Sequence, residues 1–207
     1  MKQKVNGFTI VEVALVLAVA GMIFAITFAV LPGLWASERD TARRDDMMNF
    51  ITQLKKFQTS SNRGALPKPN DENATEFQGG KSYSVLGSDA AKARSNKDKN
   101  NSNTWEGFYR DFFNDDFRDP NGNYYNLEVM FCTTAQGGDN KCSNSLLGSE
   151  ASGSLGKIGT NESRINDTIY VVIGATCDGD TAIKSANPRR VAALYRLEHA
   201  GQYCYND

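Results

Sequence analysis

The chain has 207 residues, with 23 Lys and Arg against 24 Asp and Glu and a formal net charge of −1. That length accommodates one membrane segment and one soluble domain, because domains cluster near ~100–150 residues. The near-neutral charge supplies no long-range field to attract a phosphate backbone, which argues against a dedicated nucleic-acid-binding protein.

An almost uninterrupted apolar segment covers residues 10–35. A helix of this length would extend about 39 Å at ~1.5 Å per residue, more than the ~30 Å hydrocarbon core of a bilayer. Lys2 and Lys4 precede it, so the positive-inside rule predicts a cytoplasmic start and an external remainder. Two ordinary interpretations stay open: a secretory signal with a cleavage site at residues 18–20, and a plain membrane anchor.

The residues at the start of the segment, Gly7-Phe8-Thr9-Ile10-Val11-Glu12, resemble the type IV pilin superfamily. Precursors of that family carry a short basic leader ending in glycine, then an aromatic residue, then a glutamate at the fifth mature position. The resemblance implies that a prepilin peptidase cleaves between Gly7 and Phe8 and methylates the new Phe8 amine. Phe8 would then be the first mature residue and Glu12 the fifth.

Glu12 is the one acidic residue in the apolar segment. A carboxylate within a bilayer is costly and requires a partner or a function. We expect Glu12 to neutralise the Phe8 amine of a neighbouring subunit as the helices stack, which would set the axial register. The alternative is that Glu12 reaches headgroup water and has no specific role. Pro32 lies later than the proline that is common in the family and favours a kink or local melting.

After residue 35 the helix is expected to continue and to dock on the head through an apolar stripe with helical spacing. The stripe consists of Met47, Phe50, Ile51, Leu54 and Phe57. Before it, residues 38–46 form a mixed-charge turn region in which Asp40 and Arg44 have i, i+4 spacing. We interpret that region as a solvated face, with salt pairing between subunits as the alternative. Turn formers at residues 59–64 predict the end of the helix.

Strand-like stretches follow at residues 82–86, 124–132, 168–176 and 191–198. Strands without intervening amphipathic helices predict a small antiparallel sheet. With the long helix on one face, the expected class is α+β, and the family resemblance implies the type IV pilin fold. We therefore expect a leader over 1–7, a long helix over 8–60 with its membrane or filament-core part over 8–35, and a globular head with disulfides over 61–207.

Four cysteines, all beyond the apolar segment, indicate disulfides and an oxidising, extracytoplasmic compartment. They form no CxxC pair, and one histidine is too few for a usual metal site. The sequence allows three pairings. A bond between Cys177 and Cys204 would be similar to the disulfide-bounded loop near the carboxy terminus of many type IV pilins, and Cys132 would then pair with Cys142.

Two polar tracts, 88–104 and 136–163, are expected to be exposed and mobile. The first contains basic residues that could touch DNA, although a plain loop is the favoured interpretation. Residues 119–124 predict a turn that enters a strand and resemble the Asp-Pro-x-Gly turn of pilins and type II secretion pseudopilins. Asp115, Asp116 and Asp119 suggest calcium, but their spacing is not that of an EF-hand loop, and we predict neither a metal nor a cofactor.

No catalytic set accompanies these features, and His199 beside Glu198 is expected to be a plain surface residue. The sequence therefore predicts a structural filament subunit that serves motility, adhesion or DNA uptake. Its expected partners are itself and other pilins, the prepilin peptidase, an inner-membrane assembly platform, membrane lipid before assembly, and a DNA or surface ligand. The alternatives are a pseudopilin of a type II secretion system and a membrane-tethered adhesin that does not polymerise.

Overall fold

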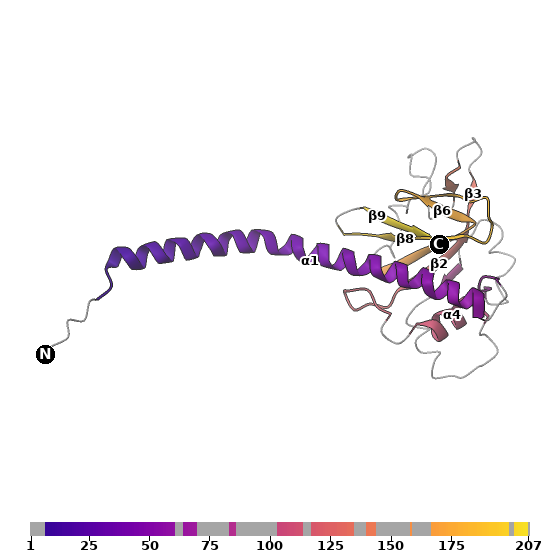
Figure 1. The fold of residues 1–207 in the computed structure, drawn as a ribbon, viewed down its shortest axis with the longest axis horizontal. Helices are drawn as coiled ribbons and strands as arrows, with labels where there is room; N and C mark the ends of the chain where they lie inside the picture. The colour runs from indigo at the N-terminus through magenta and orange to yellow at the C-terminus, as the bar shows by residue number, and fades with distance from the viewer. Residues whose placement is uncertain are drawn as a thin grey trace. The chain divides into compact units, whose positions relative to one another are not determined.

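The computed structural model describes residues 7–60, 64–69, 83–85, 103–113, 117–134, 140–143, 158, 167–198 and 201–206. The chain forms two compact units, Met1–Arg39 and Asp40–Asp207, and each is considered by itself (Figure 1). Helix α1 spans Ile10–Ser60, so it begins in the first unit and ends in the second. The division at Arg39 therefore falls inside the segment that we predicted as one long helix.

The first unit consists of the apolar part of α1. One 18-residue window has a mean hydropathy of 2.7 and no buried residue, so the helix is long and apolar enough to cross a membrane. Pro32 lies inside the helix, which continues on both sides of it. The predicted local melting is therefore absent. Proline removes only one backbone hydrogen bond, and the flanking residues keep theirs.

The second unit is built on a five-stranded sheet with the order β1-β2-β5-β8-β9. Its strands are β1 Tyr83–Val85, β2 Asn126–Phe131, β5 Thr168–Ile173, β8 Val191–Arg196 and β9 Gln202–Asn206. Two small hairpins accompany it: β3 Thr133–Thr134 with β4 Cys142–Ser143, and β6 Ala175–Asp178 with β7 Thr181–Lys184. The four predicted strands correspond to β1, β2, β5 and β8, whereas β9 and the β6–β7 hairpin were not predicted.

The expectation of an entirely antiparallel sheet is wrong at one pair of strands. β2 and β5 run parallel, with Asn126 opposite Thr168 and Phe131 opposite Ile173. The other three pairs in the sheet are antiparallel. A parallel pair needs a crossover of a dozen or more residues, and the long segment between β2 and β5 supplies it. The sheet is therefore mixed, and the coarse α+β class holds.

Helix α4, Trp105–Phe112, is a further element that the prediction missed. Thr104 caps it, because its hydroxyl oxygen accepts a hydrogen bond of 3.2 Å from the backbone N–H of Gly107. Its apolar residues recur at positions 105, 108, 109 and 112, the spacing of one helix face. The signal was present in the sequence at the end of a polar tract that we interpreted as a loop.

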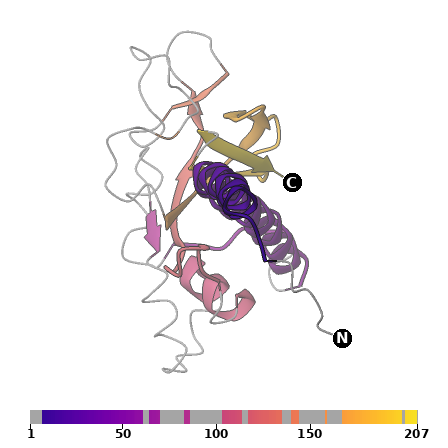
Figure 2. The ribbon, with the colours of Figure 1, turned by 90° about the vertical axis from the view of Figure 1, so that its left-hand side faces the viewer.

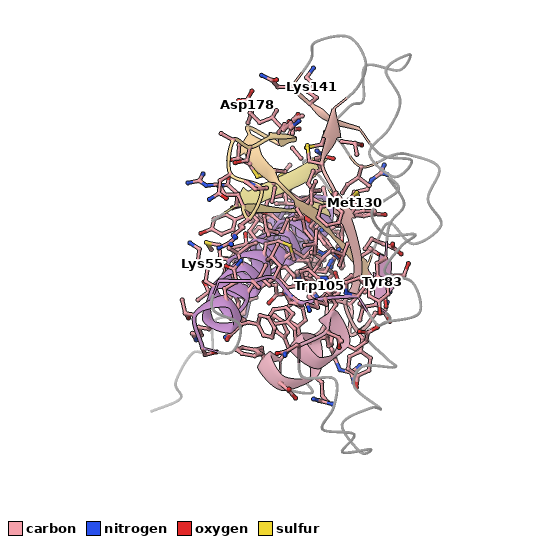
Figure 3. All side chains as sticks on the ribbon, turned by 90° about the vertical axis from the view of Figure 1, so that its right-hand side faces the viewer. Lys55, Tyr83, Trp105, Met130, Lys141 and Asp178 are labelled. Carbon is pink, nitrogen blue, oxygen red and sulfur yellow. A yellow bond between two sulfur atoms is a disulfide. The ribbon has the colours of Figure 1, made fainter. Side chains whose placement is uncertain are left out.

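The core lies on both faces of the sheet. On one face, residues 47–57 of α1 and the aromatic side chains of α4 pack against alternate residues of the strands. Figure 2 shows the ribbon of α1 lying against the sheet. The predicted stripe is confirmed, since each of its five members is at most 2% exposed. A smaller cluster that includes Met130, Tyr170 and Leu194 covers the other face (Figure 3). With both faces covered, every residue of β5 is buried.

Candidate functional site

The first turn of α1 contains a reciprocal set of hydrogen bonds between Thr9 and Glu12. The backbone N–H and the hydroxyl of Thr9 both donate to Oε2 of Glu12, each at 2.9 Å. The backbone N–H of Glu12 lies 3.3 Å from the Thr9 hydroxyl oxygen, which accepts from it. This is a capping box, in which two otherwise unpaired N–H groups at the helix start are satisfied. The Thr-x-x-Glu spacing could have revealed it in the sequence.

The capping box gives the Glu12 carboxylate a partner within its own subunit. Neither of the two roles that we expected for Glu12 included this one. A countercharge from another subunit would therefore meet a carboxylate that Thr9 already holds in place. It would also have to replace or supplement the bonds from Thr9.

The junction between Gly7 and Phe8 lies immediately before the helix. Residues 7–9 have no regular secondary structure, Gly7 is exposed, and the Phe8 side chain is 88% exposed. A peptide bond outside regular structure is more readily bound by a protease than one within a helix, where the backbone is hydrogen bonded. The junction is therefore in a chain segment that a peptidase could reach.

The apolar side chains of the first unit are exposed around the whole helix. From Ile10 to Trp35, all of the large apolar residues except the half-buried Leu31 expose between 49% and 89% of their surface. Consecutive positions such as 15, 16 and 17, and again 22, 23 and 24, belong to this set. Successive residues differ by about 100° around a helix, so these runs cover all of its sides. Such a helix needs an apolar environment on every side, as a bilayer or a bundle of helices provides.

The second polar arrangement surrounds Arg43, whose side chain is only 2% exposed. Its Nε and Nη2 donate to the two carboxylate oxygens of Asp119, at 2.7 and 3.3 Å. Its Nη1 lies 3.1 Å from Oδ1 of Asp40 and 2.8 Å from Oε1 of Glu198. The Tyr195 hydroxyl donates to Oδ2 of Asp119 at 2.8 Å. These five residues are called the Arg43 clasp below.

The clasp corrects part of our interpretation of the charged region at 38–46, which we expected to be a turn region with a solvated face. The region lies inside α1, and Asp40 and Arg43 are buried, whereas Glu38, Arg44 and Asp45 remain exposed. Salt pairing between subunits stays a prediction for the exposed residues. The pair that forms is Asp40 with Arg43, and the exposed Arg44 lies over the Tyr203 ring at 5.4 Å. The decisive partner, Asp119, is 76 positions away from Arg43, so helical spacing alone did not reveal it.

Burial and charge perturb the groups in and beside the clasp. Burial raises the pKa of Tyr195, and the nearby Asp119 raises it further. Burial alone would lower the pKa of Arg43, but its bonds to Asp119 and Glu198 outweigh that effect and raise it. Burial also raises the pKa of Asp46, although the Tyr125 hydroxyl donates to its Oδ2 at 2.7 Å and opposes the shift. The tyrosines are therefore neutral donors and the arginine is charged.

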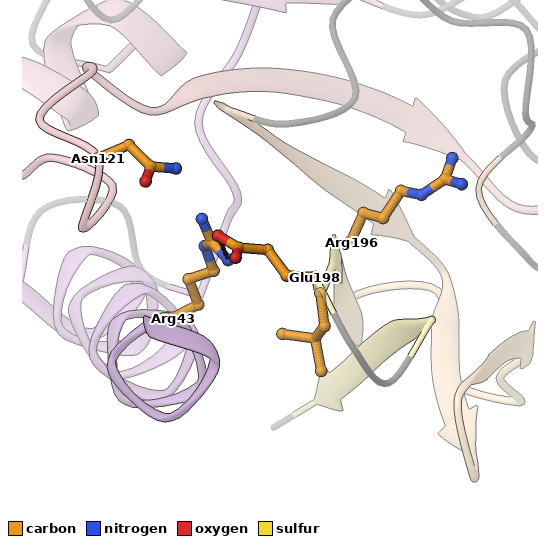
Figure 4. Close-up of a pocket in the computed structure, with 5 residues that line it drawn as sticks. Arg43, Asn121, Arg196 and Glu198 are labelled. Carbon is orange, nitrogen blue, oxygen red and sulfur yellow. Dashed lines mark ion pairs between the residues drawn. The ribbon is translucent and has the colours of Figure 1, made fainter. Parts of the chain in front are cut away.

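A pocket of about 280 Å³ lies beside the clasp. Its lining residues are Arg43, Asn121, Arg196, Leu197 and Glu198. The side chains of Arg43 and Glu198 point toward each other, and Arg196 points away from them (Figure 4). This lining offers ion pairing and hydrogen bonding, and its one carboxylate, that of Glu198, is paired with Arg43.

Of the three aspartates that suggested calcium, only Asp119 lies among the described residues. Asp119 is occupied by Arg43, Tyr195 and the backbone N–H of Asn121. Asp115 and Asp116 lie outside the described residues, as do His199, most of the leader and most of both polar tracts. Among the residues that the structure describes, no group of three His, Cys, Asp or Glu could hold a metal.

The four cysteines form two disulfides with the pairing that the resemblance implied. Cys132 is bonded to Cys142, and Cys177 is bonded to Cys204. The second bond joins the β6–β7 hairpin to the edge strand β9, close to the end of the chain. Asn206 supports the same contact, because its Oδ1 accepts a hydrogen bond of 3.0 Å from the backbone N–H of Cys177.

Comparison with known proteins gave no match to a family model, to a curated protein or to a solved structure.

Proposed function

We propose that this chain is the precursor of a pilin-like filament subunit that polymerises through its amino-terminal helix. The observation that carries the proposal is a helix that is apolar on all sides and begins directly after the Gly7–Phe8 junction. Apart from the half-buried Leu31, its large apolar residues from Ile10 to Trp35 are at least 49% exposed in the isolated chain. A bilayer before assembly and a bundle of like helices after assembly would each cover such a surface completely.

In this proposal a prepilin peptidase removes residues 1–7 and methylates the Phe8 amine. The subunit sits in the cytoplasmic membrane with its amino terminus inside and its disulfide-bonded head outside, and an assembly platform then moves it into the filament. The exposed junction before the helix supports the cleavage step. The two disulfides support an oxidising location for the head.

Intact mass of the mature protein tests the first step. We expect the loss of the first seven residues and the gain of one methyl group. An uncleaved chain would contradict the proposal and favour a plain anchor, and a cut near residue 20 would favour an ordinary secretory signal. Electron microscopy then shows whether the cleaved subunit is part of a surface fibre, as expected for a pilus. A cleaved subunit that forms no surface fibre would favour a secretion pseudopilin or a tethered adhesin.

Three variants separate the two possible roles of Glu12. Glu12→Gln removes the charge but keeps an oxygen that can accept from the Thr9 N–H, Glu12→Ala removes both, and Thr9→Val removes only the hydroxyl. If the carboxylate neutralises the Phe8 amine of a neighbour, cleavage persists in all three, and filaments are lost in both Glu12 variants. Filaments that form normally from Glu12→Gln, together with their loss in Thr9→Val, would show that helix capping alone is required.

A further inference from the structure

The apolar stripe of α1 is poorly suited to fix its own position along the sheet. Its members lie at positions 47, 50, 51, 54 and 57, and all are at most 2% exposed. A pattern of this spacing presents similar apolar side chains after each turn. Apolar burial is not directional, so a helix shifted by one turn of about 5.4 Å would still bury most of its stripe. The stripe therefore selects which face of α1 packs on the sheet, but it only weakly selects the position of the helix along the sheet.

The Arg43 clasp, by contrast, has one arrangement in which all its charges are paired. Asp40 and Arg43 come from α1, Asp119 comes from the turn before β2, and Tyr195 and Glu198 come from β8 and the residues after it. Asp40 also accepts, at its Oδ1, a 2.9 Å hydrogen bond from the backbone N–H of Glu198. The clasp thus ties one turn of the helix to two separate segments of the head. Figure 4 shows one of these contacts, that between Arg43 and Glu198.

A shift of the helix by one turn would carry Arg43 about 5.4 Å from Asp119 and leave both charges buried without each other. Such a state is strongly disfavoured. In the native register, however, the attraction between buried charges is largely offset by the loss of their hydration, so the pairing adds little net stability. A buried polar group that selects one register at little or no gain in stability is known from coiled coils.

We propose that the Arg43 clasp fixes the register of residues 40–60 of α1 on the sheet and contributes little to the stability of the head. This inference does not depend on the proposed function. It concerns only how the helix is placed within the Asp40–Asp207 unit.

The test compares the full chain with a variant that neutralises the clasp, both in detergent micelles. The neutral variant combines Arg43→Met, Asp40→Asn and Asp119→Asn, which removes buried charge but keeps oxygens that can accept from Tyr195 and from the backbone. Glu198 is retained because its side chain is 32% exposed. All native cysteines are in disulfides, so spin labels attach only to cysteines introduced at two exposed positions, Thr52→Cys on α1 and Ala186→Cys after β7. The electron–electron distance between the two labels reports the position of the helix relative to the head.

We expect one narrow distance in the unmodified clasp and, in the neutral variant, a second population displaced by up to about 5 Å, close to the rise of one turn. The melting temperature of the neutral variant should not be lower than that of the parent. A single unchanged distance would overturn the proposal, because the stripe would then set the register. A melting temperature lower by more than about 6 °C, or failure to fold, would also overturn it, because the clasp would then be stabilising.

Two further variants complete the test. Arg43→Met alone leaves Asp40 and Asp119 buried without their counter-ion, and we expect a fall of about 6–20 °C in melting temperature. An unchanged melting temperature would mean that these charges are not buried and would overturn the inference. Arg110→Met removes an arginine that pairs with its neighbour Asp111 inside one helix, so it makes a similar chemical change. It should leave the distance distribution unchanged, whereas a second population in this control would show that the clasp is not the specific cause.

Discussion

Replacing Phe50 with alanine tests whether the second half of α1 is packed on the sheet. The Phe50 side chain is fully buried, meets Phe108 edge-on and stacks on Phe113, with 5.8 Å between ring centroids in each pair. A buried Phe→Ala change costs about 3–5 kcal/mol, because burial of the ring is lost and a cavity remains. In a unit of this size each kcal/mol moves the melting temperature by about 2–4 °C. We therefore expect a fall of about 6–20 °C.

Near-ultraviolet circular dichroism of the full chain in detergent is the suitable assay, because packed aromatic side chains such as Trp105 dominate that signal. Met48→Ala is the matched control, since Met48 lies on the same helix but is 38% exposed. A surface change of this kind is usually within about 0.5 kcal/mol, which corresponds to a shift of about 2 °C at most. Equal shifts for Phe50→Ala and Met48→Ala would refute the docking of the helix on the head.

Three further changes probe other parts of the head. Burial raises the pKa of Asp46 above 3.8, so its contribution to stability is present below that pH and is lost as the pH rises through the folded pKa. Asp46→Asn should therefore raise the urea midpoint at pH 7 and have little effect below about pH 3.8; a midpoint lowered at pH 7 would contradict this. Replacing Cys177 and Cys204 by serine removes the disulfide that joins residues 27 positions apart, and it should lower the free energy of unfolding in urea by about 3.6 kcal/mol. An unchanged free energy of unfolding would show that the bond is dispensable. Thr104→Ala removes the cap of α4 and should cost about 1 kcal/mol, measured by thermal unfolding against the parent; no loss would mean that the cap is not formed.

Local patterns in the sequence were sufficient for the features that depend on neighbouring residues. The spacing from Met47 to Phe57 predicted the buried face of α1, and the turn formers after residue 58 predicted its end near Ser60. The same kind of pattern predicted four of the five strands of the main sheet. It also contained the capping box of Thr9 with Glu12 and the cap and apolar face of α4, which we did not recognise.

Features that depend on distant residues were mispredicted or missed. The parallel pairing of β2 with β5 depends on the path of the chain between them, which short-range patterns do not encode. Arg43 reads as one member of a charged, solvated segment until Asp119 is placed beside it. Once Arg43 is buried, its guanidinium has lost its hydration and requires nearby carboxylates, which a solvated arginine does not need.

The sequence alone determined that the chain has an apolar amino-terminal helix, a polar remainder with four cysteines, and a Gly7–Phe8 junction directly before the helix. These features are local because helix periodicity, hydropathy and short sequence motifs involve residues close together in the chain. Only the tertiary structure decided the strand order, the burial of the charges around Arg43, and the placement of Glu12 within a bonded first turn. Packing and hydrogen-bond geometry are set by groups that meet in space, and their separation in the sequence does not reveal which groups meet.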